Sequence, residues 1–288
     1  MKRMFIGMMI LMAACVGGAE APEGSGSPVP FPTPAPSPTA TPLPPPAHLV
    51  ICVDRSGSYH EWTRPALVAI ADLIPELAIS GPGWRLDLRW IESNSYRPEA
   101  HIGTLELPPL PPLPGPMPTF TPWPTPENPL ERYEPTREAQ ATRQAEEEER
   151  LNEAKDRIQR SYQDARRQAL KFAEGLRRLQ PEVAQRSDIW GCLIKASELF
   201  ASRPASDRWL LIASDMEEAG VQQKNSLKLH GVHVRIVFWK ATKAAQAQRI
   251  RETWTRWFQE AGAADVRFFD PALGLDPIRQ ELLPGGKP

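Results

Sequence analysis

A carboxylate and two hydroxyl groups stand close together at Asp54, Ser56 and Ser58, directly after an apolar run. The run Leu49–Val53 predicts a strand buried on both faces, because parallel strands covered by helices read as continuous hydrophobic segments. The polar residues would then occupy the loop at the carboxyl end of a central strand, where open α/β sheets bind ligands. Oxygen donors without histidine suit a hard divalent cation such as Mg²⁺.

The segment Asp54-Arg-Ser-Gly-Ser58 resembles the first part of the metal-ion-dependent adhesion site of von Willebrand factor type A (VWA) domains. Two further parts follow in the family's order. Ser187, in Arg-Ser-Asp-Ile, resembles the second part, which is usually Gly-Thr-Asn-Ile or Gly-Thr-Asp-Ile. Asp215, in Ala-Ser-Asp-Met, resembles the third, which is usually Thr-Asp-Gly. This chain departs from the pattern in having serine at 187 and Met216 in place of glycine.

The resemblance implies a set of roles around one Mg²⁺ or Mn²⁺ ion. Ser56 and Ser58 would bind the ion directly, and Ser187 directly or through water. Asp54 and Asp215 would act mainly through hydrogen bonds to the ligating waters and hydroxyls. An ion with few carboxylate ligands keeps net positive charge, so a protein partner could supply a carboxylate as its last ligand. The resemblance therefore implies adhesion by a surface-anchored, metal-dependent binding module.

Each candidate residue also has a purely structural interpretation. Asp54 and Ser56 could form a helix-capping turn, and Ser187 could be only the N-cap of a following helix. Asp215 could be only a turn residue at the end of a strand. An aspartate after the first strand is also the nucleophile of phosphotransferases of the haloacid dehalogenase type, but these have a second aspartate where this chain has Ser56. We therefore expect no enzyme, and keep a structural exported lipoprotein without a working metal site as the alternative.

Four other residues near these segments have two interpretations each. Cys52 and Cys192 fit small buried hydrophobic residues, while a disulfide between them is an alternative for a protein outside the cytoplasm. Glu217 and Glu218 border the third segment, either as further ligands or as part of a solvated loop.

The elements that must position these residues alternate between strands and helices. Strict alternation of apolar and charged residues places the strand at 84–91 nearer a sheet edge. The pattern predicts an α/β fold, a three-layer open, mainly parallel sheet with helices on both faces (VWA/Rossmann-like), over 48–283. The resemblance itself covers about 48–107 and 160–270. Strands are predicted at 48–54, 84–91, 101–107, 207–215, 233–239 and 264–269, and helices at 63–79, 162–179, 189–200, 244–261 and 276–283.

A proline-rich and then charged stretch at 108–150 interrupts this pattern, and we interpret it as an insertion. A long helical pattern runs from 135 to 179, and its apolar stripe covers only the later two-thirds. Tyr162–Leu179 is therefore expected to pack on the sheet while the rest projects. A coiled-coil partner for the stripe is the alternative.

Residues 1–15 read as a signal peptide with a lipobox. A basic start is followed by about eleven apolar residues, too short a run to span a bilayer. Leu11–Cys15 resembles a bacterial lipoprotein signal, which implies that Cys15 becomes the lipid-modified mature N-terminus. The chain is therefore expected on the extracytoplasmic side of the cell membrane, held there by the lipid. Plain secretion and an uncleaved anchor are the alternatives.

The remaining segments have little capacity to form a core. Residues 16–47 are mostly Pro, Thr, Ser, Ala and Gly, which predicts a disordered tether with polyproline II character. Residues 284–288 form a short tail. The net charge of −1 gives no argument for nucleic acid as a partner, so a protein is the expected ligand.

Overall fold

A computed structural model describes residues 45–80, 83–110, 137–217, 227–240 and 243–283, which belong to one compact unit. None of the helices in these ranges has both the length and the hydrophobicity that crossing a bilayer requires.

Several predictions concern residues outside the described ranges and stay predictions. These residues are the signal peptide 1–15 with Cys15, nearly all of the tether 16–47, residues 111–136 of the insertion, Glu218 and the tail 284–288.

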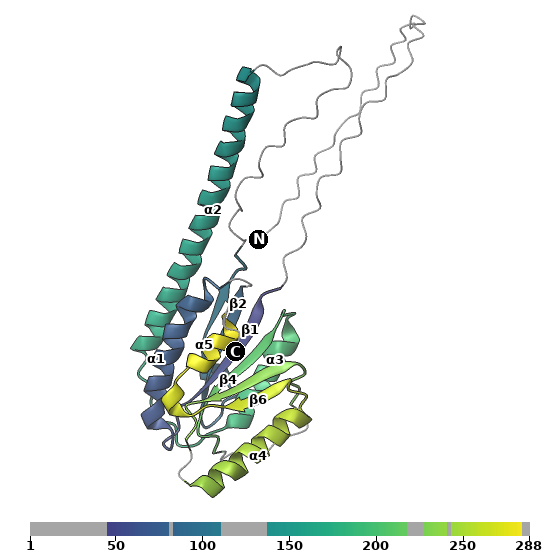
Figure 1. Cartoon of the computed structure of the whole chain (residues 1–288). Coiled ribbons are helices and arrows are strands. Elements are labelled where there is room, and N and C mark those ends of the chain that lie inside the picture. Colours follow the sequence, from purple (N-terminus) through teal and green to yellow (C-terminus); the bar gives the residue numbers. More distant parts are fainter. Residues whose placement is uncertain (1–44, 81–82, 111–136, 218–226, 241–242, 284–288) are drawn as a thin grey trace, which may run out of the picture. The chain divides into compact units, whose positions relative to one another are not determined.

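Six strands form one sheet in the order β3-β2-β1-β4-β5-β6 (Figure 1). All neighbouring pairs are parallel except β2 and β3, which are antiparallel. This is the doubly wound strand order, and it confirms the predicted mainly parallel, VWA/Rossmann-like α/β fold. The strands are β1 (Ala47–Asp54), β2 (Trp84–Ile91), β3 (His101–Leu107), β4 (Arg208–Ala213), β5 (Val232–Val237) and β6 (Asp265–Phe268).

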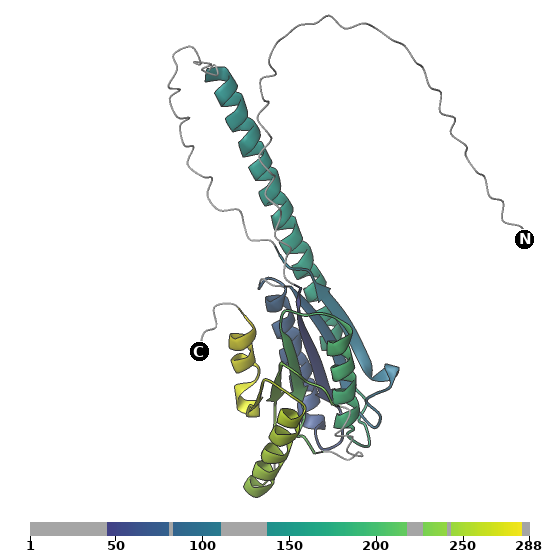
Figure 2. The ribbon, with the colours of Figure 1, turned by 90° about the vertical axis from the view of Figure 1, so that its right-hand side faces the viewer.

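Helices cover both faces of the sheet and complete the predicted three layers (Figures 1 and 2). One face carries α1 (His60–Leu77), α2 (Arg137–Arg178) and α5 (Asp276–Leu282). The other face carries α3 (Ile189–Ser202) and α4 (Ala244–Glu260). Two short 3₁₀ helices are at Pro98–Ala100 and Pro271–Leu273.

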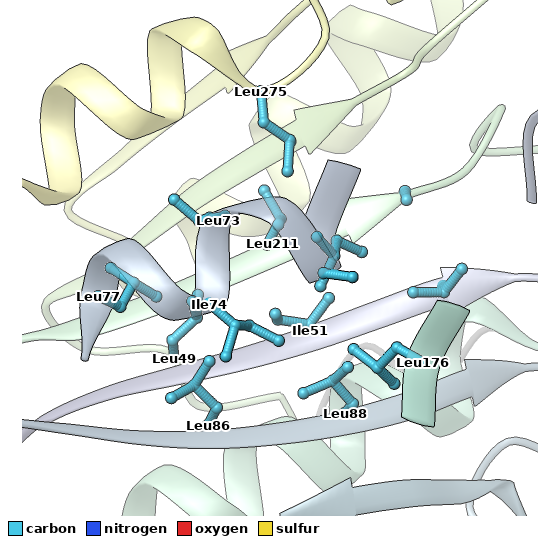
Figure 3. Close-up of a cluster of buried hydrophobic side chains, with 14 of the residues drawn as sticks. Leu49, Ile51, Leu73, Ile74, Leu77, Leu86, Leu88, Leu176, Leu211 and Leu275 are labelled. Carbon is cyan, nitrogen blue, oxygen red and sulfur yellow. The ribbon is translucent and has the colours of Figure 1, made fainter. Parts of the chain in front are cut away.

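The central strand β1 is buried along its whole length, which is why its sequence is a continuous apolar run. Leu49 and Ile51 point into the core on the side of α1, and Figure 3 shows them beside Ile74. Val50 and Cys52 point into the second core, beneath α3 and α4. The strand that ends at the polar loop is therefore held from both sides.

β2 is the second strand from one edge of the sheet, as the prediction of a place nearer an edge implied, but the solvent-facing side inferred from its alternation is wrong. β2 lies between β1 and β3, and seven of its eight residues are buried. Two of its three charged residues, Asp87 and Arg89, are buried with partners inside the fold, so the alternation did not mark a solvent-facing side. Asp87 accepts a hydrogen bond from His48 at 2.8 Å. The Arg89 guanidinium donates to the backbone carbonyls of Ser95 at 2.9 Å and Arg97 at 2.7 Å.

The later part of α2 packs against α1 and β3, in agreement with the contact expected for Tyr162–Leu179. Ala169, Ala173 and Leu176 are buried in the core that α1 shares. The Arg177 guanidinium pairs with Asp72 on α1. Small residues in the stripe allow the two helices to approach closely.

Candidate metal centre

The three predicted segments meet at the carboxyl edge of the sheet. Asp54 is the last residue of β1, and Asp215 follows β4. The two strands pair in parallel with Val53 opposite Ala213, so their polar ends lie side by side. Strand order reverses between β1 and β4, and this switch point is where open α/β sheets bind ligands. Ser187 comes from the loop before α3.

One carboxylate gathers these segments together. Asp54 is fully buried, and its Oδ1 accepts a hydrogen bond from the Ser56 backbone N–H at 2.8 Å. Its Oδ2 accepts from the Ser214 hydroxyl at 2.8 Å. The Ser187 hydroxyl lies 3.3 Å from Oδ2 and 3.5 Å from Oδ1. Residues more than 130 positions apart in the sequence therefore bond to the same side chain.

The interpretation of Ser187 as the N-cap of α3 is wrong. The cap is Asp188, whose Oδ1 accepts from the Gly191 N–H at 2.8 Å. Its other oxygen accepts from the Ser95 N–H at 2.9 Å, which fixes the loop after β2 to the same turn. Because the neighbouring carboxylate caps the helix, the Ser187 hydroxyl is free to bond to Asp54.

The spacing of the Ser56 and Ser58 hydroxyl oxygens fits a small octahedral ion. The hydroxyls of Ser56 and Ser58 are 3.3 Å apart. Adjacent ligands of an octahedral ion with bonds near 2.0–2.1 Å are separated by about 3 Å, so a small adjustment suffices. Asp215 Oδ1 accepts from the Glu217 N–H at 2.9 Å, which leaves Oδ2 without a partner among the described residues. No three His, Cys, Asp or Glu side chains in those ranges cluster to hold a metal, so an ion at this site would depend on hydroxyl ligands.

The electrostatics of the site favour a cation. Burial raises the pKa of Asp54 to about 6, against the opposing effect of its hydrogen bonds from Ser56 and Ser214, and the Asp215 charge raises it further. Burial also raises the pKa of Glu217, and the charge of Asp215 adds to this effect. Negative charge is therefore concentrated at this edge, and no positive group within the described ranges balances Asp54.

Tyr59 adds an unused hydroxyl to the same region. Its side chain is 1% exposed, and its hydroxyl has no hydrogen-bond partner among the described residues. Burial raises the pKa of Tyr59, and so do the charges of Asp54 and Asp215, in that order. Buried polar groups without a partner are rare, and they occur at sites that bind water or ions.

The third segment is held in a fixed conformation. Met216, which stands where the family usually has glycine, is buried and has a positive φ of 61°. This region of backbone space costs an L-residue roughly 1–2 kcal/mol. The Trp239 indole donates to the Asp215 carbonyl at 3.2 Å, and the Trp254 indole donates to the Met216 carbonyl at 2.9 Å. The hydrogen bonds from these two tryptophans thus hold Met216 in a left-handed backbone conformation that glycine adopts without strain.

Besides Tyr59, sequence reasoning missed two hydroxyls that bond to Asp54. Ser214 bonds to the Asp54 side chain, and Thr63 donates to the Asp54 carbonyl at 2.8 Å. The signal for Ser214 was its position directly before Asp215, at the strand end that aligns with Asp54. Thr63 lies one helical turn into α1, and nothing in the sequence pattern marked it.

The alternative of a disulfide is the one that the structure contains. Cys52 and Cys192 are bonded, with Cα atoms 6.5 Å apart and 140 positions between them. The bond joins β1, two residues before Asp54, to the first turn of α3. It therefore ties the first segment to the element that follows the second. Such cross-links typically contribute about 2–4 kcal/mol.

Comparisons with known proteins give structural likeness only. No protein-family model matches the sequence, and no curated protein matches it. Among solved structures, the chain is similar to a von Willebrand factor type A protein from Catenulispora acidiphila, with 12% identity and a TM-score of 0.40. That match covers 83% of this chain and 42% of the other.

Two further similar structures are of metal-loaded proteins. Proximal thread matrix protein 1 from the mussel byssus, with a zinc-occupied MIDAS motif, is 8% identical at a TM-score of 0.36, covering 83% of this chain and 45% of that one. The manganese-loaded TRAP protein of Plasmodium vivax is 14% identical at a TM-score of 0.36, covering 81% and 73%. This chain thus spans less than half of the first of these and of the Catenulispora protein. Scores this low carry no functional argument, so the fold assignment rests on strand order and direction.

Proposed function

We propose that this chain is a metal-dependent binding module of the VWA type. A divalent cation, Mg²⁺ or Mn²⁺, would bind among Asp54, Ser56, Ser58, Ser187 and Asp215. The observation that carries the proposal is the buried Asp54 carboxylate. It accepts hydrogen bonds from a backbone N–H of its own loop and from the Ser187 and Ser214 hydroxyls of two distant segments, yet has no positive partner among the described residues. When bound, the ion would offer an open position to a carboxylate of a protein partner.

Some of the chain's own residues would hold the metal ion, and others would orient the residues that hold it. Ser56 and Ser58 present two hydroxyl oxygens at a separation that suits one ion. Asp54 orients the Ser56 loop and the Ser187 hydroxyl through hydrogen bonds, so it would shape the site without binding the metal directly. Asp215 keeps one carboxylate oxygen for the ion or for a water bound to it.

The arrangement around Asp54 does not suit a nucleophile. Both of its carboxylate oxygens already accept hydrogen bonds from the protein, and the side chain is fully buried. A phosphotransferase of the haloacid dehalogenase type would also need an acid two positions later, where Ser56 stands. We therefore propose a binding function and no enzyme activity.

The proposed location is the extracytoplasmic side of the membrane, with Cys15 as the lipid attachment point. The disulfide between Cys52 and Cys192 supports a compartment outside a reducing cytoplasm. Labelling cells with a fatty-acid probe should mark the wild-type protein. The Cys15→Ala variant should lose the label, and label that persists in it would refute lipidation at this residue.

The metal site is tested by thermal unfolding of the full chain with Mg²⁺ and with chelator. At an ion concentration of 100 times the Kd, binding adds about 2.7 kcal/mol to the free energy of unfolding. Ser58→Ala should reduce this gain, because it removes an exposed ligand without disturbing the core. Ser206→Ala, an exposed serine at the other end of β4, is the matched control and should keep the full gain.

The alternative, an exported structural lipoprotein without a working metal site, predicts a different result. Isothermal titration of the wild-type protein would show no binding even at millimolar Mg²⁺ or Mn²⁺. If binding is present, affinity capture with Mg²⁺ against chelator identifies the partner, which should be released by chelator.

A further inference from the structure

A pocket of about 510 Å³ lies at the same edge of the sheet as the candidate metal centre. β3 runs antiparallel to β2, so the first residue of β3 lies where β2 ends, at the carboxyl edge. The pocket is built from this residue, from the segment that connects β2 to β3, and from one residue of α3. Its lining residues are Tyr96, Arg97, Pro98, His101 and Lys195. Two of these are cations, and none is an acid.

Two contacts join this pocket to the segments that form the metal centre. One carboxylate oxygen of Glu92 pairs with Arg97 at 3.4 Å, and the other pairs with Arg55. Arg55 belongs to the first segment of the metal centre. The Ser95 N–H, one position before the pocket, donates to Asp188 at 2.9 Å, and Asp188 directly follows the serine of the second segment. The pocket therefore borders the loops that would hold the ion.

Hydrogen bonds from outside the pocket fix two of its side chains. The Tyr96 hydroxyl donates to one carboxylate oxygen of Glu198 at 2.6 Å, and the Lys195 ammonium donates to the other at 2.8 Å. The same ammonium lies 5.2 Å from the centre of the Tyr96 ring. Although held in this way, the Tyr96 side chain is 47% exposed. A ligand would therefore meet a preformed wall, which lowers the entropy lost on binding.

The cations at this pocket outnumber the carboxylates that pair with them. Arg97 shares the single Glu92 carboxylate with the guanidinium of the metal loop, and Lys195 pairs with Glu198. Three positive groups thus pair with two carboxylates. Glu99, a further acid of the same segment, does not line the pocket. The charge of the lining therefore favours an anionic group as its ligand.

We propose that this pocket is a second contact for the protein partner of the metal centre, and that it binds an acidic side chain of the segment that supplies a carboxylate to the ion. The inference rests on the proposed function and narrows its partner to an acidic segment with at least two carboxylates. Tyrosine and arginine, which both line the pocket, are among the residue types that contribute most to binding at protein interfaces.

A partner held at both places gains affinity from each. Once one carboxylate binds the ion, a second one nearby on the same segment reaches the pocket at a high effective concentration. An exposed ion pair contributes only about threefold to affinity, because water screens it. The pocket would therefore select acidic partners among those that the ion can bind.

The test measures the Kd of a labelled glutamate peptide for the full chain by fluorescence anisotropy, with Mg²⁺ in excess. Such a peptide contains every spacing between two carboxylates. The reference ligand is a peptide of the same length with one glutamate among serines. Wild type should bind the glutamate peptide more tightly than the reference, and binding of both should require Mg²⁺.

Two double variants separate the pocket from general charge. Arg97→Gln with Lys195→Gln should weaken binding of the glutamate peptide about tenfold and leave the reference peptide unchanged. Arg166→Gln with Lys228→Gln is the matched control, because these two exposed residues carry the same charges and do not line the pocket. It should bind both peptides as wild type does.

Thermal unfolding with Mg²⁺ and with chelator distinguishes the ways in which the inference can fail. Equal binding by wild type and the pocket variant, or equal weakening in the control, would overturn the second contact. A gain from Mg²⁺ in wild type would then leave the metal centre standing. Absence of that gain would overturn both. An unchanged gain in the pocket variant, together with lost affinity for the glutamate peptide, would assign the loss to the pocket.

Discussion

Two buried aspartates in neighbouring strands of this sheet have opposite surroundings. Asp54 ends β1, and burial raises its pKa to about 6 because only hydroxyls and a backbone N–H bond to it. Asp87 lies in the middle of β2. Burial acts on it in the same direction, but hydrogen bonds from His48, Thr104 and Arg85, together with the Arg85 charge, hold its pKa well below the usual range.

The difference shows that the fold supplies a positive charge to compensate the Asp87 carboxylate, whereas the described residues supply none to the Asp54 carboxylate. Asp87 has a guanidinium at 2.7 Å, so the fold itself compensates its burial. Asp54 has no such group in the part of the chain that the structure describes, and the charge that acts on its pKa is that of another carboxylate, Asp215. A buried acid is unfavourable without a cation. We therefore interpret Asp87 as structural and Asp54 as part of a site that a metal ion completes.

The largest effect is expected at the structural aspartate. Asp87→Asn removes the charge that Arg85 and His48 bond to inside the fold. Breaking a buried ionic cluster by removing one partner typically destabilises a protein by about 3–5 kcal/mol. Urea unfolding of the variant should show this loss equally with Mg²⁺ and with chelator. A loss confined to one of the two conditions would mean that Asp87 is linked to the metal site.

At Asp54, the corresponding substitution is expected to raise the stability of the metal-free protein. Asp54→Asn keeps the shape and an acceptor but removes the buried charge. The difference between a pKa of about 6 in the fold and the ordinary 3.8, at about 1.36 kcal/mol per pH unit, corresponds to about 3 kcal/mol. With chelator at pH 7, the variant should therefore be more stable than wild type by up to this amount. It should also lose the gain from Mg²⁺, and a gain equal to that of wild type would contradict the proposed site.

The same argument fixes a dependence on pH. An acid whose pKa is raised by folding stabilises the fold below its unfolded value and loses this contribution as pH rises through the folded value. Without metal, the stability of wild type relative to Asp54→Asn should therefore fall between about pH 4 and pH 6. Because a cation favours the ionised carboxylate, the gain from Mg²⁺ should increase over this window. Chemical denaturation at pH 4.5 and pH 7 measures both, and a flat difference would refute the raised pKa.

Much of the fold was predictable, because local pattern and long-range packing agree. The continuous apolar run of β1 predicted a central strand, and the structure buries every residue of it. The exposed face predicted for β2 was wrong for the opposite reason. Its Asp87 and Arg89 look solvent-facing in sequence, yet their partners are at positions 48, 95 and 97, and nothing local announces those contacts.

The candidate site was predictable as far as its motif extends. Asp54, Ser187 and Asp215 were found by resemblance, and the structure brings their segments together. Ser214, Thr63 and Tyr59 were missed, because their roles depend on the register of β4 and on how side chains after the first loop pack against Asp54. Such roles arise only when distant segments meet, so a pattern along the chain does not report them.

The smallest expected change in stability comes from removing one hydroxyl group near each of the two aspartates. The Tyr59 hydroxyl is buried without a partner among the described residues, so Tyr59→Phe should raise metal-free stability by about 1 kcal/mol. The Thr104 hydroxyl donates to Asp87 at 2.5 Å, so Thr104→Val should lower it by about 1 kcal/mol or less, since that side chain is exposed. Thermal unfolding with chelator compares the two. Should Tyr59→Phe destabilise the protein instead, its hydroxyl has a partner such as a bound water. The carboxyl edge would then already be as complete as the surroundings of Asp87, and its need for a cation would have to be argued from Asp54 alone.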